Sequence, residues 1–181
     1  GNIYMNVKEN FDLIIERYPF SEKYKKSVMD YLELKGDDFY VKSYQTNAKA
    51  KMSSYRTNDD IFDPLINFIA LILKNKISNI NKSNIPIFLQ EFWVVNYGVN
   101  DYTESHMHGG STFSFVYFLN CPKGSSPLLF TSSKKKIRAE EGKLVIFPGN
   151  INHRVPKNKC DNRIVLCGNV LLSTGKVMKK L

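Results

Sequence analysis

The histidines are the residues of this sequence whose spacing best suits chemistry. The chain has three, and two of them, His106 and His108, are separated by a single residue. Side chains at positions i and i+2 of a β-strand point to the same face, so the two imidazoles are expected to project into one space. His153 follows a β-rich run with a proline turn, and a sandwich of strands can bring that turn against the first pair. Neutral imidazole binds iron, copper, nickel and zinc, and three ligands on one face of an octahedron leave three positions for substrate and oxygen.

Arg163 lies ten residues after His153, at the start of the β-rich run RIVLCGNVLL. A guanidinium inside a barrel is costly unless it is paired, and its planar fork matches a carboxylate. An arginine that points inward beside a metal site therefore implies an anionic ligand. The alternative is an ordinary arginine on the surface of a strand, and the histidines too could be surface residues with no shared role.

Glu104 is a competing metal ligand. In a regular strand, Glu104, His106 and His108 would all lie on one face, so a carboxylate could reach the metal. We favour the set of three histidines, because the segment around Glu104 is expected to form a loop, which does not keep the alternation of a strand.

The first 80 residues have the periodicity of helices. Apolar residues recur at spacings of three and four in residues 7–18, 21–34 and 60–77, which predicts three amphipathic helices. Ser21 is the expected N-cap of the second helix, and Gly36 is its expected C-terminal stop. The polar segment between the second and third helices is expected to be extended.

From Ile85 onward the sequence consists of short β-rich runs punctuated by Pro, Gly and Asn. Their even spacing indicates an antiparallel sandwich or barrel. We expect a single domain over residues 1–181, in which residues 1–82 form a helical N-terminal layer and residues 83–181 form the β core. The expected strands are residues 87–98, 111–120, 126–132, 143–149, 153–156 and 162–172.

The composition is that of a globular protein with an excess of basic residues. The chain has 181 residues, of which 43% are hydrophobic, which suits one domain with a sizeable core. No apolar run is long enough to span a membrane, and the charged N-terminus is unlike a signal peptide, so we expect a cytoplasmic protein without a membrane partner. A net charge of +9 often marks proteins that bind nucleic acid or membrane surfaces. Here the lysines are scattered and no nucleic-acid-binding motif is present, so an acidic macromolecular partner is the less favoured interpretation.

Several motifs together resemble the iron(II)- and 2-oxoglutarate-dependent oxygenases. They are the HxH pair, the strand SFVYFLN, the run EEGKLVIFPGNINH, and the arginine ten residues beyond the last histidine. Their order and spacing are similar to those of the small prolyl-hydroxylase-like group found in phages and bacteria. The resemblance covers about residues 88–172, roughly half of the chain.

The resemblance implies a mostly β fold, a double-stranded β-helix (jelly roll) packed against the N-terminal helices. It implies that Fe(II) is held by His106, His108 and His153. It also implies that Arg163 pairs with the distal carboxylate of 2-oxoglutarate, with Tyr97 as a further contact of this cosubstrate. Asn169 matches an asparagine of the family and is counted with Arg163 and Tyr97 among the expected cofactor-binding residues.

The implied reaction is hydroxylation of a second substrate, coupled to the oxidative decarboxylation of 2-oxoglutarate by O2. A peptidyl side chain is the favoured prime substrate, and nucleic acid is the alternative. The implied location is the cytoplasm, or the host cytoplasm for a phage protein.

The sequence departs from the family at three positions. His108 stands where these enzymes usually have a carboxylate ligand, so the metal site is expected to have one negative charge fewer. Phe118 and Val165 stand where relatives often have a tyrosine and a serine, so the cosubstrate pocket is expected to be less polar.

Two other classes of protein are consistent with these residues. One is a cupin-like metal dioxygenase with three histidine ligands, although no glutamate follows His108 at the cupin spacing and Arg163 would have no cosubstrate to bind. The other is a non-catalytic metal-binding module that holds a partner on its basic face. Turnover of 2-oxoglutarate in the presence of iron separates the oxygenase from both.

Overall fold

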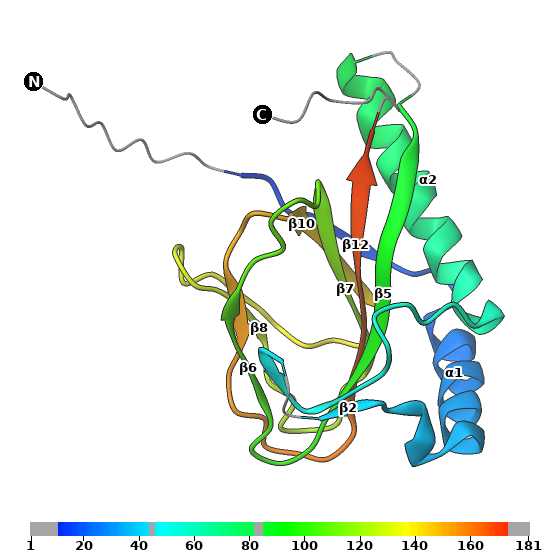
Figure 1. The fold of residues 1–181 in the computed structure, drawn as a ribbon, viewed down its shortest axis with the longest axis vertical. Coiled ribbons are helices and arrows are strands. Elements are labelled where there is room, and N and C mark those ends of the chain that lie inside the picture. The colour runs from blue at the N-terminus through cyan, green and yellow to red at the C-terminus, as the bar shows by residue number, and fades with distance from the viewer. Residues whose placement is uncertain (1–10, 44–45, 82–84, 174–181) are drawn as a thin grey trace, which may run out of the picture.

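Two antiparallel β-sheets pack face to face, and two helices cover the outer face of the larger sheet (Figure 1). This computed structural model describes residues 11–43, 46–81 and 85–173. The larger sheet has seven strands in the order β1 (Ile14–Arg17), β10 (Lys143–Pro148), β7 (Phe113–Asn120), β12 (Arg163–Leu172), β5 (Ile87–Tyr97), β4 (Lys51–Met52) and β2 (Lys42–Ser43).

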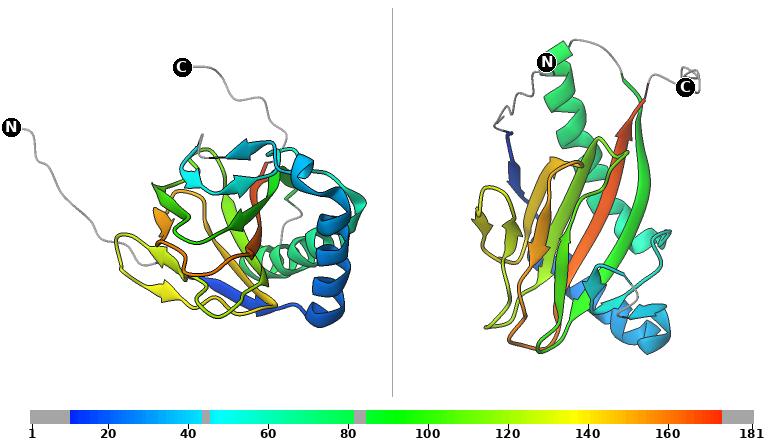
Figure 2. Two further views of the ribbon diagram at one scale, coloured as in Figure 1. Left: turned by 90° about the horizontal axis from the view of Figure 1, so that it is seen from below. Right: turned by 60° about the vertical axis from the view of Figure 1, so that its left-hand side comes forward.

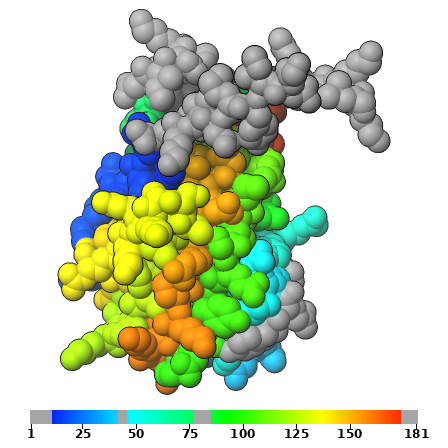
Figure 3. Space-filling model, turned by 90° about the vertical axis from the view of Figure 1, so that its left-hand side faces the viewer, coloured from blue at the N-terminus to red at the C-terminus, as the bar shows by residue number. Residues whose placement is uncertain are grey.

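The smaller sheet lies across the larger one on the side away from the helices (Figure 2). Its strands form the surface that faces the viewer in Figure 3. It has five strands in the order β3 (Ala48–Lys49), β6 (Tyr102–His106), β11 (His153–Val155), β8 (Leu128–Phe130) and β9 (Lys136–Ile137). The sequence pattern therefore correctly predicts a β-rich second half with antiparallel, jelly-roll-like pairing.

Strand alternation divides the buried residues between two apolar cores. On β12, Ile164 and Leu166 face the helices, whereas Val165 and Cys167 face the smaller sheet. Successive side chains of a strand point to opposite faces, so a central strand with a core on each side is apolar at nearly every position. The space between the two sheets is the one that contains the histidines.

The helices form where the periodicity predicts them. They are α1 (Ser21–Lys35) and α2 (Asp63–Asn81), preceded by the short 3-10 helix η2 (Asp60–Phe62). A second 3-10 turn, η1 (Asp37–Phe39), follows α1. Their apolar stripes pack on the larger sheet, with Val28, Phe62, Leu65 and Leu73 fully buried. No helix among the described residues is long and apolar enough to cross a membrane.

The ends of α1 match the expectations in part. Gly36 caps the C-terminus with a φ of 68°, and its backbone N–H donates to the carbonyl of Leu32. Ser21 is the first helical residue rather than the N-cap, which is Phe20, and no side chain caps this end. The helix α1 thus begins one residue earlier than a cap at Ser21 would require.

The predicted helix over residues 7–18 is wrong for the part of it that the structure describes. Ile14–Arg17 forms β1, which pairs with β10 at the edge of the larger sheet, with Ile14 opposite Ile146. Residues 7–10 lie outside the described part of the chain. The apolar spacing of this short run suits either structure, and pairing with the otherwise open edge of β10 decides in favour of the strand.

Candidate active site

The histidines are brought together by one antiparallel strand pair and the loop that follows it. His106 is the last residue of β6 and lies directly opposite His153, the first residue of β11. His108 lies beyond the end of β6, where its backbone N–H donates to the carbonyl of Gly149 at 2.8 Å. The expectation that both His106 and His108 belong to a strand is therefore wrong for His108, and the loop itself brings its imidazole back to the pair.

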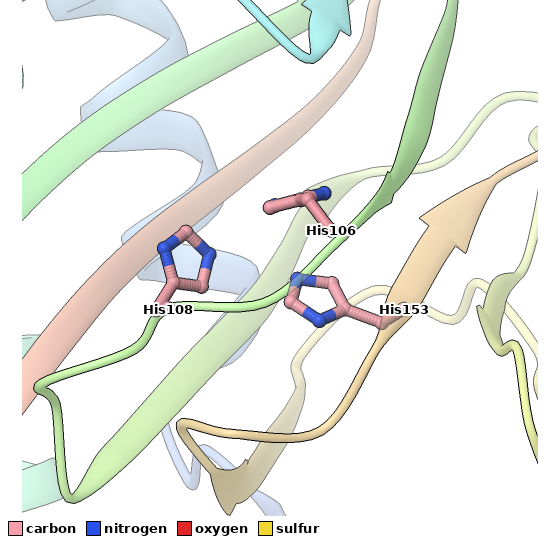
Figure 4. A group of neighbouring side chains, drawn as sticks. All are labelled: His106, His108 and His153. Atoms are coloured by element: carbon pink, nitrogen blue, oxygen red, sulfur yellow. The ribbon is translucent and has the colours of Figure 1, made fainter.

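The three imidazoles converge on one point (Figure 4). One ring nitrogen from each of His106, His108 and His153 lies within 4.8 Å of the other two. The ring centroids of His106 and His153 are 4.3 Å apart, and that of His108 is 4.9 and 5.4 Å from these two. This is the arrangement that a single metal ion needs in order to bind all three.

Glu104 is not part of this group, for a reason other than the expected one. It lies within β6 and not in a loop, but the pairing with β11 shifts between His153↔His106 and Val155↔Thr103. Glu104 and Ser105 of β6 thus oppose the single residue Arg154 of β11, which is a β-bulge. The bulge turns Thr103 and His106 toward the interior and leaves Glu104 exposed.

Burial keeps the imidazoles in their neutral form. It lowers the pKa of His108 to about 4 and that of His153 to about 3, and the neighbouring His106 adds to both shifts. Burial also lowers the pKa of His106. A charged imidazole without a counter-ion is unfavourable here, so near neutral pH each ring keeps one unprotonated nitrogen.

Two of the three rings are oriented by backbone carbonyls. Nδ1 of His106 lies 2.8 Å from the carbonyl oxygen of Glu104, and Nδ1 of His153 lies 2.9 Å from that of Ile151. A carbonyl only accepts hydrogen bonds, so Nδ1 carries the proton in both rings and Nε2 keeps its lone pair. Such a contact fixes the tautomer and the direction of a metal-binding imidazole.

The histidines line a cavity of about 260 Å³ between the two sheets. Its wall on the larger sheet is formed by alternate residues of the paired strands β5 and β12. Arg163, fully buried, lies at one end of it, and the exposed Met107 and Asn47 lie at its rim. The cavity therefore extends from the buried guanidinium of Arg163 to the surface, and the three imidazoles also line it.

Arg163 is a buried cation whose two terminal nitrogens have no partner among the described residues. Its Nε donates to the carbonyl of Ser126 at 2.8 Å, but Nη1 and Nη2 make no hydrogen bond. The guanidinium carbon lies 4.6 Å from the centre of the Tyr97 ring and 5.5 Å from that of Phe118. The aromatic rings stabilise the charge but accept no hydrogen bond in the plane of the guanidinium, so the two free N–H edges are suited to an anion.

Tyr97 lies directly opposite Arg163 in the β5–β12 pair and lines the same cavity. Its hydroxyl lies 2.6 Å from Oγ1 of Thr103, and burial raises its pKa to about 12. The phenol is therefore neutral near pH 7 and can serve as a hydrogen-bond donor or acceptor inside the cavity.

Asn169 lies six positions after Arg163 on β12 and contacts His108. Its Nδ2 lies 3.3 Å from Nδ1 of His108 and 2.6 Å from Oε2 of Glu91, and its Oδ1 accepts from the Ser114 hydroxyl at 2.8 Å. With a rise of about 3.3 Å per residue, Asn169 is roughly 20 Å along the strand from Arg163. Asn169 thus lies beside His108, away from Arg163, and is not among the residues that line the cavity.

Glu91, Trp93, Thr103 and Ser126 are part of this site and are absent from the residues that the sequence singled out. Glu91 and Trp93 share a face of β5 with Tyr97 at spacings of two and line the cavity. Trp93, the single tryptophan of the chain, has its ring centroid 5.7 Å from that of His108. Strand alternation counted back from Tyr97 would have found both, whereas Ser126 comes from a loop with no such periodicity.

No family model matches the chain, and no curated protein matches its sequence. Solved structures do match its fold. A viral collagen prolyl hydroxylase from Paramecium Bursaria Chlorella virus-1 aligns with a TM-score of 0.69 and 14% identity over 87% of this chain and 94% of the viral protein. A prolyl-4-hydroxylase from Pseudomonas putida aligns with a TM-score of 0.68 and 11% identity over 89% of this chain and 93% of its own.

A third match has a different kind of molecule bound. HygX from Streptomyces hygroscopicus, solved with nickel, 2-oxoglutarate and hygromycin B, aligns with a TM-score of 0.62 and 9% identity over 93% of this chain and 86% of HygX. At such low identities the likeness establishes a shared fold. The chain thus has the fold of prolyl hydroxylases and related 2-oxoglutarate oxygenases, as the sequence resemblance implies.

The donor set suits a divalent transition metal. Three neutral nitrogen ligands on one side of a point are a usual arrangement for iron, nickel, copper or zinc. The described residues include no thiolate or carboxylate that joins the group of three imidazoles. A metal held there would keep its full charge of +2, which favours an anionic ligand in its remaining positions.

Proposed function

We propose that the chain is an iron(II)- and 2-oxoglutarate-dependent oxygenase built on a double-stranded β-helix that hydroxylates a second substrate. The observation that carries this proposal is that a possible metal site and a buried cation share one cavity. Three imidazoles converge in it, and a fully buried arginine in the same cavity has two terminal nitrogens without a partner. A metal site alone would not require that arginine.

Arg163 is the proposed binding residue for the distal carboxylate of 2-oxoglutarate. A guanidinium stays charged in proteins, and burying it without a partner costs free energy that a bidentate carboxylate contact recovers. The Ser126 carbonyl and the ring of Tyr97 hold the guanidinium in place and leave its outer edge free. Tyr97 is proposed as a further contact of the cosubstrate, and the apolar Val165 and Phe118 exclude water around it.

His106, His108 and His153 are the proposed iron ligands. The carbonyls of Glu104 and Ile151 direct Nε2 of His106 and His153 toward the metal position. When bound, iron(II) supplies the activation of O2 that is coupled to oxidative decarboxylation of 2-oxoglutarate, with succinate and carbon dioxide as coproducts. The chain contributes the ligand face, the arginine that orients the cosubstrate, and an interior shielded from bulk water.

A peptidyl side chain is the proposed class of prime substrate. Two of the structures that share this fold are named as prolyl hydroxylases, and the cavity opens at an exposed rim where an extended peptide can lie. HygX, which has this fold, was solved with hygromycin B bound, so the fold also binds molecules other than peptides. An acidic macromolecule such as nucleic acid is the alternative that the net charge of +9 supports.

The test is iron-dependent conversion of 2-oxoglutarate to succinate, followed by NMR in the absence and presence of candidate peptides. We expect slow uncoupled turnover that chelation abolishes, and faster turnover with a true substrate. Arg163→Leu should lose turnover, whereas Arg154→Leu, which removes an arginine that does not line the cavity, should retain it. Metal binding without any turnover would instead favour the non-catalytic binding module, and turnover that survives Arg163→Leu would contradict the assigned role of this arginine.

A further inference from the structure

His108 differs from the other two histidines in what its Nδ1 contacts. In His106 and His153, Nδ1 meets a backbone carbonyl, whereas in His108 it meets the side-chain amide nitrogen of Asn169 at 3.3 Å. A carbonyl demands a proton on Nδ1, and an amide nitrogen, which is a donor, demands a lone pair there. The third ring is therefore set in the opposite tautomer.

The orientation of the Asn169 amide is determined by its neighbours. The oxygen and nitrogen of an amide look alike, so the assignment must follow the hydrogen-bond network. A carboxylate has no hydrogen to donate, so the Asn169 atom that lies 2.6 Å from Oε2 of Glu91 must be the nitrogen. The oxygen then faces Ser114, whose hydroxyl donates to it at 2.8 Å. Glu91 thus turns an N–H group toward His108.

The proton of a neutral His108 is consequently on Nε2. An Nδ1 that accepts the N–H of Asn169 carries no proton itself, so the ring is neutral and has a single proton. Figure 4 shows one ring nitrogen of His108 turned toward the other two imidazoles and the other turned away. The nitrogen turned away is Nδ1, because it is the one that contacts Asn169. The nitrogen that faces the metal position therefore carries a hydrogen, and a protonated nitrogen cannot bind a metal.

We propose that Glu91 controls, through Asn169, whether His108 can act as a metal ligand. In the metal-free protein two imidazoles are ready to bind, and the third is held in its non-binding tautomer. Binding by His108 moves its proton from Nε2 to Nδ1 by exchange with solvent, with no net gain or loss of protons. The Asn169 amide reverses so that its oxygen accepts this proton and its nitrogen donates to Ser114.

Because the Asn169 amide must reverse, Glu91 is the residue that disfavours metal binding by His108. After it, the amide oxygen of Asn169 faces the carboxylate oxygen of Glu91, and two acceptors cannot remain at 2.6 Å. Glu91 must turn away, which costs the charge-assisted hydrogen bond that it makes in the metal-free state. Glu91 and Asn169 are thus positioning residues that act on the metal through His108. This inference rests on the proposed metal site and not on the proposed reaction.

The direct test is NMR of protein labelled with 15N-histidine, in the presence of a chelator at pH 7.5. The chain has three histidines, so single His→Ala variants assign all of the ring signals. We expect the Nδ1–H pattern for His106 and His153 and the Nε2–H pattern for His108. In Glu91→Gln the signals of His108 should shift toward Nδ1–H, since a glutamine can also donate to the reversed amide. An Nδ1–H pattern for His108 in the wild-type protein would overturn the inference.

A double-mutant cycle separates this effect from the simple loss of a negative charge near the metal. Zn(II) affinity is measured by calorimetry for wild type, Glu91→Gln, Asn169→Ala and the double variant. In the Asn169→Ala background, Glu91→Gln removes only charge. In the wild-type background Glu91→Gln also releases the Asn169 amide. Its effect on Zn(II) affinity should therefore be about fivefold more favourable than in the Asn169→Ala background, which corresponds to one hydrogen bond of roughly 1 kcal/mol.

The control is Glu104→Gln, which removes an exposed carboxylate close in sequence to His106 but outside this network and should show no coupling with Asn169→Ala. Equal effects of Glu91→Gln in the two backgrounds would show that Glu91 acts through its charge alone, against the inference. Neither experiment involves 2-oxoglutarate. If the ring signals are as expected but 2-oxoglutarate is not turned over, the result counts against the proposed reaction. If 2-oxoglutarate is turned over but the ring signals of His108 are not as expected, the result counts against the control of His108 by Glu91.

Discussion

Arg163 and Tyr97 lie directly opposite each other on neighbouring strands, with the guanidinium carbon of Arg163 4.6 Å from the centre of the Tyr97 ring. The pair buries a cation against an aromatic face at one end of the cavity and leaves the terminal nitrogens of the arginine free of other partners among the described residues. The cavity is thereby made selective for an anion.

Replacing Arg163 by alanine should weaken binding of 2-oxoglutarate by ~2–5 kcal/mol, because the distal carboxylate would be buried without its partner. The metal affinity should stay largely intact, since Arg163 contacts none of the imidazoles. Calorimetry with the manganese-loaded protein measures both. An unchanged affinity for 2-oxoglutarate would place the carboxylate site elsewhere.

The purified protein should bind one iron(II) or manganese(II) per chain. Trp93 gives an optical signal, because its ring lies 5.7 Å from His108 and a paramagnetic ion at the site should quench its fluorescence. His153→Ala should lose most of the binding, and Glu104→Ala should bind like wild type. If Glu104→Ala abolished binding and His108→Ala were tolerated, the ligand set would be Glu104, His106 and His153.

His108→Asp should keep metal binding and detectable 2-oxoglutarate turnover, whereas His108→Ala should lose most of both. A carboxylate at this position can accept the N–H of Asn169 with one oxygen and bind the metal with the other, so it needs no reversal of the amide. It also reduces the formal charge of the metal site from +2 to +1, which should hold the metal more tightly and attract the dianionic cosubstrate less. Metal titration and succinate release measure the two effects separately.

Acidification should destabilise the metal-free fold, and His153 should account for part of the loss. The folded pKa of His153 is about 3, below the value near 6.5 of an unfolded chain. Between these values the unfolded state binds a proton that the folded state does not, so stability falls as the pH falls below about 6.5. Two pH units below that value, near pH 4.5, the contribution is about 2–3 kcal/mol.

Urea denaturation at pH 7.5 and pH 4.5, with a chelator present, checks this prediction. His153→Asn removes the titrating group, so it should lose less stability on acidification than wild type. An equal loss in both proteins would mean that the pKa of His153 is not depressed in the folded state.

If the basic charge serves an acidic partner, binding should weaken steeply with salt, while uncoupled turnover should change little. Lys134, Lys135 and Lys136 are exposed at the β8–β9 hairpin. The hydroxyl of Thr131 in this hairpin lies 2.6 Å from that of Ser105 on β6. Replacing the three lysines by serine should reduce the salt slope of nucleic-acid or acidic-peptide binding. A slope that is zero in both proteins would mean that the charge serves no such partner.

The sequence predicts the elements that rest on local periodicity. The helix stripes over residues 21–34 and 60–77 and the β-rich runs from residue 87 onward are each found as structure. These patterns reflect burial against a single neighbouring layer, which a local window of sequence records. The short run Ile14–Arg17 fails because its structure depends on pairing with a strand far along the chain.

The sequence allowed the residue types of the site to be predicted, but not their arrangement in space. Strand alternation would put Glu104 beside His106, and only the bulge against β11 separates them. The protonation of His108 depends on Glu91 and Asn169, which meet because β5 and β12 pair in one particular register. Neither a bulge nor a register can be deduced from the spacing of residues along one strand.

The direct pairing of His106 with His153 also bears on how the chain folds. β7, β8, β9 and β10 lie between their strands in the sequence, so this contact closes a long loop, and we expect it to form late in folding because closing that loop costs entropy. A metal ion can bridge the two strands only after that closure. It should therefore slow unfolding and raise the melting temperature with metal concentration, while leaving the rate of folding almost unchanged.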